Sequence, residues 1–216
     1  MTFSQVLQLI IPFLRESLVT LQIFFYTLLF ALPLGLIICV GRMSKIPVLT
    51  QIIKFYLLIV RGTPLILQII FIYFLPDDLG FKMIDRFWAV IIAFTLNYAA
   101  YFAEIYRSGI SSIPSGQNEA AYVLGYSKIQ AFFKIIVPQM IKRILPPMGN
   151  EFMTLVKDTA LAQTIGVAEL FHIAYNNTSR LSSTVPIYIA GLFYLVMNAI
   201  VSLFFSAAEK KLDYYK

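Results

Sequence analysis

Long apolar segments restrict the fold of this chain more than any other feature of its sequence. Five runs, each of about 20 mostly apolar residues, cover residues 18–40, 53–75, 87–106, 148–170 and 185–205. A helix of that length crosses the ~30 Å hydrocarbon layer of a membrane. Backbone amides find no water there, so segments that cross must be helical. The sequence therefore predicts an all-α integral membrane protein with five transmembrane helices, in a single domain covering residues 1–216.

Composition agrees with this class and excludes several others. The chain is 59% hydrophobic and 13% charged, with a mean hydropathy of +0.79, whereas soluble domains are about a quarter charged. The net charge of +6 is typical of basic cytoplasmic loops in a membrane protein, so we expect no nucleic-acid partner. The single cysteine, Cys39, excludes a disulfide within the chain, and the single histidine, His172, does not indicate a metal site.

The first 14 residues are apolar but lack the features of a cleaved signal peptide. They carry neither a basic segment at the start nor a small-residue cleavage site. Pro12 removes one backbone donor from any helix that contains it. We therefore expect residues 1–14 to form an interfacial helix that is interrupted at Pro12.

The distribution of Lys and Arg predicts the orientation of the spans. Eleven of these residues fall in one set of segments between the spans and at the C-terminus, and four fall in the opposite set. Basic residues accumulate on the cytoplasmic side of membrane proteins. The N-terminus is therefore expected outside and the C-terminus in the cytoplasm, together with the long polar segment 107–147.

That polar segment cannot span a membrane, but it carries clear helix signals. Ser115 is expected to cap a short helix that stops at Gly125, because glycine readily adopts the left-handed backbone of a helix end. Ser127 and Gln130 have the spacing of a capping box at the start of a second helix. Pro138 is predicted to end or bend this second helix.

Motifs spread from about residue 20 to residue 166 resemble one known family and occur in its order. They are Thr20-Leu21, Arg42-Met43-Ser44, Arg61-Gly62-Thr63-Pro64, Glu119-Ala120-Ala121 followed by Gly125, Asn150-Glu151-Phe152 and Lys157-Asp158-Thr159. They resemble the EAA loop and the other signatures of permease subunits in polar amino-acid ABC importers, of the histidine, glutamine, arginine and cystine type. Phe133 departs from the family, which often has arginine at that position.

The resemblance implies the type I permease fold of ABC importers, and a transport subunit rather than an enzyme. Glu119, Ala120, Ala121 and Gly125 would belong to coupling helices seated in a cytoplasmic ABC ATPase dimer. ATP and Mg would bind that partner. We expect no cofactor to bind this chain, which lacks the G-x-x-x-x-G-K-[ST] phosphate loop. Other implied partners are an extracytoplasmic amino-acid-binding protein and a second permease, preferably a second copy. The implied location is a prokaryotic cell membrane.

Charged residues at membrane depth are costly and are therefore candidates for function. Glu151 and Asp158 are seven residues apart, so they share one helix face at a separation of about 10 Å. Such a face either lines a polar pathway or holds structurally paired acids, and we favour the pathway. Glu104 is expected instead to pair with Arg107, three residues later on the same helix.

A broken helix is predicted inside the second span. Thr63 followed by Pro64 resembles an N-cap and the first residue of a new half-helix. Free amides after Thr63, helped by Arg61, would bind the α-carboxylate of an amino acid, as discontinuous helices do in other transporters. The ammonium group or a cationic side chain would be bound by Asn97, Glu151 and Asp158. The alternative is that Arg61 and Pro64 only shape a kink.

Two other functions remain open from the sequence. An ion-coupled secondary amino-acid carrier would use Glu104 or Glu151 as a proton or sodium site, without an ATPase. A membrane enzyme would use Glu151 and Asp158 as acid and base, although no nucleophile with an orienting base accompanies them. A co-purifying ATPase separates the permease from both. The two acids favour arginine, lysine or histidine as substrate, while glutamine and cystine also present an ammonium group.

Overall fold

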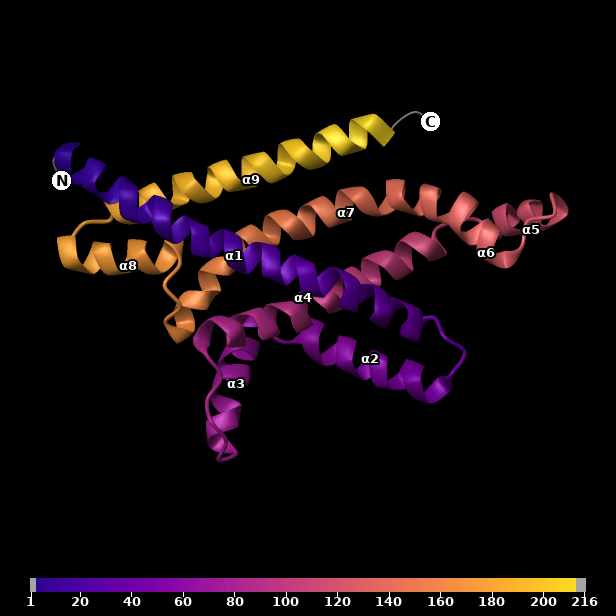
Figure 1. The fold of residues 1–216 in the computed structure, drawn as a ribbon, viewed down its shortest axis with the longest axis horizontal. Helices are drawn as coiled ribbons and strands as arrows, with labels where there is room; N and C mark the ends of the chain where they lie inside the picture. The colour runs from indigo at the N-terminus through magenta and orange to yellow at the C-terminus, as the bar shows by residue number, and fades with distance from the viewer. Residues whose placement is uncertain (1–2, 213–216) are drawn as a thin grey trace.

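The structure is a computed structural model that describes residues 3–212, with side chains from Leu9 onward, and these residues form helices and connections without a strand (Figure 1). The α-helices are α1 (Phe3–Arg42), α2 (Pro47–Gly62), α3 (Leu65–Asp78), α4 (Arg86–Ser111), α5 (Ser115–Val123), α6 (Lys128–Ala131), α7 (Val137–Asp158), α8 (Leu170–Leu181) and α9 (Val185–Leu212). The predicted all-α fold is confirmed. Lys216, one of the basic residues behind the predicted orientation, lies outside the described residues.

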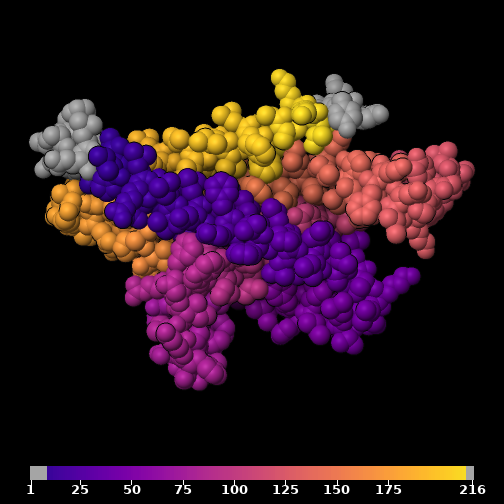
Figure 2. Space-filling view, viewed as in Figure 1, coloured from indigo at the N-terminus to yellow at the C-terminus, as the bar shows by residue number. Residues whose placement is uncertain are grey.

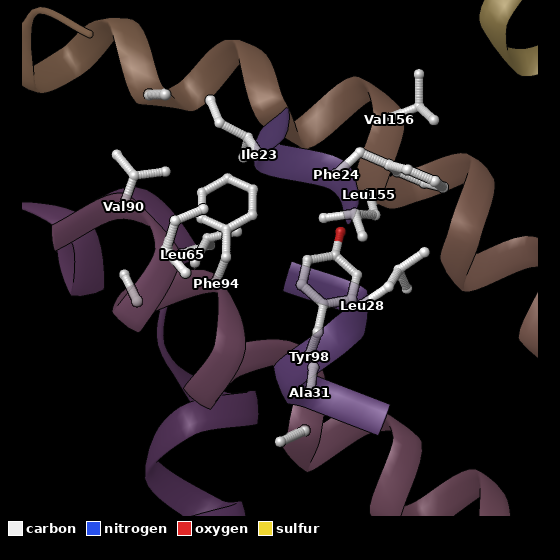
Figure 3. Close-up of a cluster of buried hydrophobic side chains, with 14 of the residues drawn as sticks. Ile23, Phe24, Leu28, Ala31, Leu65, Val90, Phe94, Tyr98, Leu155 and Val156 are labelled. Atoms are coloured by element: carbon white, nitrogen blue, oxygen red, sulfur yellow. The ribbon is translucent and has the colours of Figure 1, made fainter. Parts of the chain in front are cut away.

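The core lies where α1 packs along α4, with α7 beside them. A Cβ placed on Gly35 of α1 would lie 2.9 Å from the Cβ of Phe102 and 3.1 Å from the carbonyl oxygen of Ala99, both on α4. Small residues allow helices in a membrane to approach this closely. Figure 3 shows apolar side chains from α1, α3, α4 and α7 filling this core, among them Ile23, Leu65, Phe94 and Leu155.

The number of spans differs from the prediction. Within the described residues, α1 from Leu9 onward, α4 and α9 are each long and apolar enough to cross a membrane. The helices α2 and α3 meet the same criteria only as a pair, and they are bent by 109° at the break between them. The structure therefore contains up to four spans by length and composition, so the predicted number of five is not confirmed.

The predicted span 148–170 is not one helix. The helix α7 ends at Asp158, the chain tightens into a 3-10 segment (Thr159–Ile165), and Gly166 adopts a left-handed φ of 75°. Within that segment Ala162 and Ile165 are buried inside the protein. Apolar composition does not distinguish burial in protein from exposure to lipid, and the sequence pattern therefore merged the end of α7 with the turn that follows.

The predicted interruption at Pro12 is also wrong, because α1 continues through both Pro12 and Pro33. Proline supplies a helical φ, and the backbone bond that it removes is tolerated in helices that pack against neighbours. Phe13 is fully buried, with its ring centroid 6.0 Å from that of Phe193 on α9. Packing therefore holds this segment in line with the rest of α1.

The polar segment after α4 forms two short helices, as predicted. Gly125 has φ 81° and ends the first of them, and Ser127 and Gln130 form the complete capping box of the second. The predicted cap at Ser115 is wrong, because Ser115 is the first residue of α5 and the capping position is occupied by Pro114, which makes no side-chain bond. Proline at this position presets the backbone that enters the helix.

Pro138 does not end the second helix. A π-helical turn (Phe132–Ile136) follows α6 and leads directly into α7. Pro138 lies directly after this turn, and a π-helical turn is one of the local adjustments by which a helix accommodates the backbone donor that proline lacks. The helix α6, the π-helical turn and α7 therefore form one nearly continuous helical rod, which carries Glu151, whereas α5 is joined to it by the turn at residues 124–127.

Candidate functional site

A polar cavity of about 450 Å³ lies between α2, α4 and α7. Its polar lining comes from all three helices and includes Arg61, Tyr101, Glu104, Arg107, Ser112, Arg143 and Glu151. The cavity therefore brings together Arg61 and Glu151, which are 90 positions apart in the sequence and were both predicted to bind substrate. We refer to it as the Arg61–Glu151 cavity.

Most charges of this cavity are already paired. Arg107 donates to both carboxylate oxygens of Glu104, with distances from 2.8 to 3.1 Å, as predicted from their spacing. Arg143 donates to the backbone carbonyl of Ser112. Arg143 connects α7 to the end of α4, and the Glu104–Arg107 pair, within α4, leaves neither oxygen of Glu104 without a hydrogen bond.

Arg61 and Glu151 are the exceptions. The guanidinium of Arg61 lies over the ring of Tyr101, 5.3 Å from its centroid, and 4.0 Å from the carboxylate of Glu104. These contacts are attractive, but the second is too long to be a hydrogen bond. Among the described residues neither Arg61 nor Glu151 makes a side-chain hydrogen bond. One guanidinium and one carboxylate therefore face the cavity with their hydrogen-bonding groups unused.

Asp158 shares the helix of Glu151 but has a different environment. Its carboxylate accepts a hydrogen bond of 2.8 Å from the hydroxyl of Tyr98, a residue that is almost fully buried. Figure 3 shows the Tyr98 hydroxyl pointing from α4 toward α7 through the apolar core. The bond ties the end of α7 to α4, and Asp158 is not among the residues that line the Arg61–Glu151 cavity.

The break between α2 and α3 is held by one side chain that the sequence analysis missed, Gln68. Its amide nitrogen donates to the carbonyls of Val60 (2.8 Å) and Thr63 (3.1 Å) and to the Thr63 hydroxyl (2.9 Å). Its amide oxygen accepts from the side chain of Asn97 at 3.0 Å. We call Thr63, Gln68 and Asn97 the bend cluster. It supplies hydrogen bonds to backbone carbonyls that lose their helical partners at the break.

Thr63 is not the N-cap that was predicted. Its backbone is extended, as expected for a residue before proline, and its hydroxyl turns back to donate to the Ile59 carbonyl of α2 at 2.8 Å. Pro64 occupies the capping position of α3 and makes no side-chain bond. The predicted break is confirmed, but Thr63 closes the end of α2 instead of opening α3.

The five predicted substrate residues therefore occupy three places. Arg61 and Glu151 face one cavity. Asp158 is bonded to Tyr98 in the core. Thr63 and Asn97 belong to the bend cluster, beside a separate and mainly apolar hollow.

The predicted coupling residues lie at one end of the molecule, on the segment that projects beyond α4 and α7 (Figures 1 and 2). Glu119 and Ala120 are exposed, while Ala121 is buried against the rest of the segment. Large apolar side chains next to them are exposed, namely Tyr122, Val123, Leu124, Ile129 and Phe133. Apolar side chains gathered on one projecting element are typical of a protein interaction site.

Glu169 is a second residue that sequence reasoning missed. It is fully buried and caps α8 by accepting from the amides of Phe171 (2.8 Å) and His172 (2.7 Å), and it also accepts from the hydroxyl of Tyr194 at 2.8 Å. Glutamate is not a strong capping residue, so no local signal identifies it. Within the described residues no group of His, Cys, Asp and Glu could hold a metal ion.

Comparison with known proteins identifies the family. A model described as "Binding-protein-dependent transport system inner membrane component" matches residues 31–214. The arginine transport system permease protein ArtQ of Bacillus subtilis is 39% identical over 205 residues, which are 94% of this chain and 93% of the relative. The L-cystine transport system permease protein TcyB of the same organism is 37% identical over 198 residues, which are 91% and 84% of the two chains.

Solved structures agree with this assignment. A chain from the crystal structure of an amino acid ABC transporter with histidines has a TM-score of 0.90 and 33% identity, and the match covers 98% of this chain and 99% of that chain. The inward-facing MetNI methionine ABC transporter matches with a TM-score of 0.72 at 19% identity, which shows the same fold. The chain therefore belongs to the family of binding-protein-dependent transport system inner membrane components, the permease subunits of ABC importers.

Proposed function

We propose that this chain is the permease subunit of an importer for polar amino acids, with cationic amino acids as its preferred substrates. The observation that carries the proposal is the pair of charged groups without hydrogen bonds, Arg61 and Glu151, on a single cavity. An amino acid carries an α-carboxylate and an ammonium group, and a cationic one carries a second positive charge. The relatives named for arginine and cystine transport support this substrate class.

Arg61 and Glu151 bind the substrate in different ways. The guanidinium of Arg61 presents a planar set of donors that matches a carboxylate, and it binds the group that every amino acid shares. The carboxylate of Glu151 binds positive charge, so it adds most to the binding of arginine, lysine or histidine. Thr63 and Asn97 act indirectly by holding the bend that places the end of α2, and Asp158 by holding α7 against α4.

We place the energy supply in a partner protein. A cytoplasmic ABC ATPase dimer, which binds ATP and Mg, receives the segment with Glu119, Ala120, Ala121 and Gly125. Its exposed apolar side chains support such a contact. The helix α5 packs against the start of the rod formed by α6, the π-helical turn and α7, and this rod carries Glu151. Binding and hydrolysis of ATP would thereby move the helices that line the cavity between outward-open and inward-open states.

Two further partners complete the proposed importer. An extracytoplasmic amino-acid-binding protein delivers the substrate on the side of the N-terminus, and a second copy of this chain encloses the pathway. In the 18-residue apolar stretch of α9, only 6% of the residues are buried within the chain. The exposed surface of this helix is available to lipid or to a second subunit. The charge distribution supports a cytoplasmic C-terminus in a prokaryotic cell membrane.

The test is ATPase activity of the reconstituted importer with its ATPase and binding protein, scanned across the amino acids and cystine. We expect a sharp stimulation by arginine, lysine or histidine. A response confined to neutral or acidic amino acids would contradict the cationic preference. Purification of the active transporter without any ATPase would contradict the proposed energy supply and favour an ion-coupled carrier.

A further inference from the structure

A second charged hollow, of about 400 Å³, lies between the end of α1, α2 and α4. Arg42 contributes from α1, Lys54 and Arg61 from α2, and Glu104 from α4. Three cations thus face a single carboxylate. Arg61 and Glu104 also line the Arg61–Glu151 cavity, so these two residues form the wall between the two spaces.

The single carboxylate does not neutralise the three cations. Both oxygens of Glu104 accept hydrogen bonds from Arg107 at 2.8 to 3.1 Å. Arg42 and Arg61 approach Glu104 only to 4.0 Å, which is too long for a hydrogen bond. The Nε atom of Arg42 is buried without an acceptor among the described residues, and no described residue forms an ion pair or hydrogen bond with Lys54. The hollow therefore has a surplus of positive charge and unused donors.

The apolar surroundings of the hollow indicate what kind of anion fits. Leu57 and Leu58 line it. On the same helix, Leu58 is 71% exposed, Phe55 63% and Ile52 61%. A small inorganic anion would use only the cations, whereas a molecule with a phosphate and acyl chains would use the cations and the exposed apolar face together.

The position along the helices agrees with the surface of a membrane. The apolar span of α1 ends at Arg42, and the connection to α2 lies toward the end of the molecule that carries α5 and α6 (Figure 1). Basic residues at the end of an apolar helix lie at the level of lipid headgroups. Arg42 is thus at headgroup level. Lys54 lies seven residues after the start of α2 and would reach the same phosphate with its long side chain. The apolar face of α2 would then lie against the acyl chains.

We propose that this hollow binds an anionic phospholipid through its headgroup phosphate, with Arg42 and Lys54 as the principal contacts. The inference does not depend on which solute is transported. It concerns a different space from the Arg61–Glu151 cavity, and lipid binding is measured without an amino acid or ATP. Failure of lipid binding therefore leaves the proposed function intact, and failure of transport leaves the lipid site intact.

The experiment is native mass spectrometry of the full-length chain, purified as its native complex in detergent and titrated with lipids of matched acyl chains. We expect phosphatidylglycerol to bind at least tenfold more tightly than phosphatidylcholine. The double variant R42Q/K54Q should lose roughly thirtyfold in affinity for phosphatidylglycerol, because each basic residue near an anionic surface contributes about fivefold. Lys45→Gln is the matched control, since Lys45 is exposed on the same connection but does not line the hollow.

Two further measurements keep the test decisive. Lys54→Gln alone removes no ion pair or hydrogen bond to a described residue, so it should fold normally and lose about fivefold in affinity. Inorganic phosphate at the lipid concentration should not displace phosphatidylglycerol. The proposal is overturned by equal binding of the two lipids, or by full affinity for phosphatidylglycerol in both R42Q/K54Q and Lys54→Gln. An equal loss of affinity in Lys45→Gln, or displacement of the lipid by inorganic phosphate, would also overturn it.

Discussion

The bend cluster and the Arg61–Glu151 cavity both place polar side chains within the helical bundle, but they use them in opposite ways. In the bend cluster, Gln68 satisfies two backbone carbonyls and one hydroxyl and is itself held by Asn97. In the cavity, Arg61 and Glu151 face open space without a hydrogen bond to a described residue. Saturated polar groups stabilise a shape, and unsaturated ones are available to a ligand.

This difference separates variants that damage the fold from variants that damage transport. Substitutions in the bend cluster should lower stability and affect all substrates alike, through the amount of folded protein. Substitutions of Arg61 or Glu151 should leave the fold unchanged and alter the substrate profile.

Gln68→Leu should be the most damaging change in the bend cluster. It leaves the carbonyls of Val60 and Thr63 and the amide of Asn97 without their partner, and each unsatisfied buried group costs roughly 1–3 kcal/mol. We expect a loss of about 2–4 kcal/mol in unfolding free energy, measured by denaturation in mixed micelles. Gln51→Leu is the matched control, because Gln51 is exposed on α2. Equal stability of the two variants would show that the cluster does not hold the bend.

Arg61→Gln should lower transport without a comparable loss of stability. The guanidinium is proposed to bind the α-carboxylate, so uptake of neutral and cationic amino acids should fall by the same factor, roughly tenfold or more for one charge-assisted hydrogen bond. Uptake into proteoliposomes and thermal unfolding of the same preparations provide the measurement. A selective loss for cationic substrates alone would contradict this role.

Glu104→Gln tests a carboxylate that lines the same cavity but is already paired. It removes the charge that holds Arg107 and attracts Arg42, and we expect a loss of about 1–2 kcal/mol in unfolding free energy. The ratio of arginine to glutamine uptake should stay unchanged. A shift in that ratio as large as the one caused by a Glu151 variant would remove the distinction between the two acids.

Thr63→Val should have the smallest effect of the series. It removes one hydroxyl that donates to the Ile59 carbonyl and accepts from Gln68, for an expected loss of about 1 kcal/mol. Thr63→Ser keeps the hydroxyl and should retain nearly all stability. If the valine variant is as stable as the serine variant, the hydroxyl does not contribute to the bend.

Features set by neighbouring residues could be predicted from the sequence. The stop at Gly125, the capping box at Ser127 and the Glu104–Arg107 pair all depend on spacings of one to three residues and are confirmed. The length of the apolar segments and the composition predicted the all-α membrane class, which the structure confirms. The residues that carry the EAA resemblance, Glu119 to Gly125, lie on the projecting segment.

Features set by distant partners could not be predicted. Gln68 and Glu169 are ordinary polar residues in the sequence, and their roles depend on Asn97 and Tyr194, which the fold brings beside them. The division of the two acids on α7, with Asp158 bonded to Tyr98 and Glu151 facing the cavity, likewise depends on α4. The seven-residue spacing places both acids on one helix face, but it does not determine which residues each carboxylate contacts.

The measurement that tests the proposed site most directly is the ratio of arginine to glutamine uptake by wild type and by Glu151→Gln, in proteoliposomes with the ATPase and binding protein. Glu209→Gln, an exposed acid on α9, is the control. We predict that Glu151→Gln lowers arginine uptake at least tenfold more than glutamine uptake, while the control leaves both unchanged. An equal loss for both substrates, or no loss for arginine, would contradict the assignment of Glu151 to the cationic group.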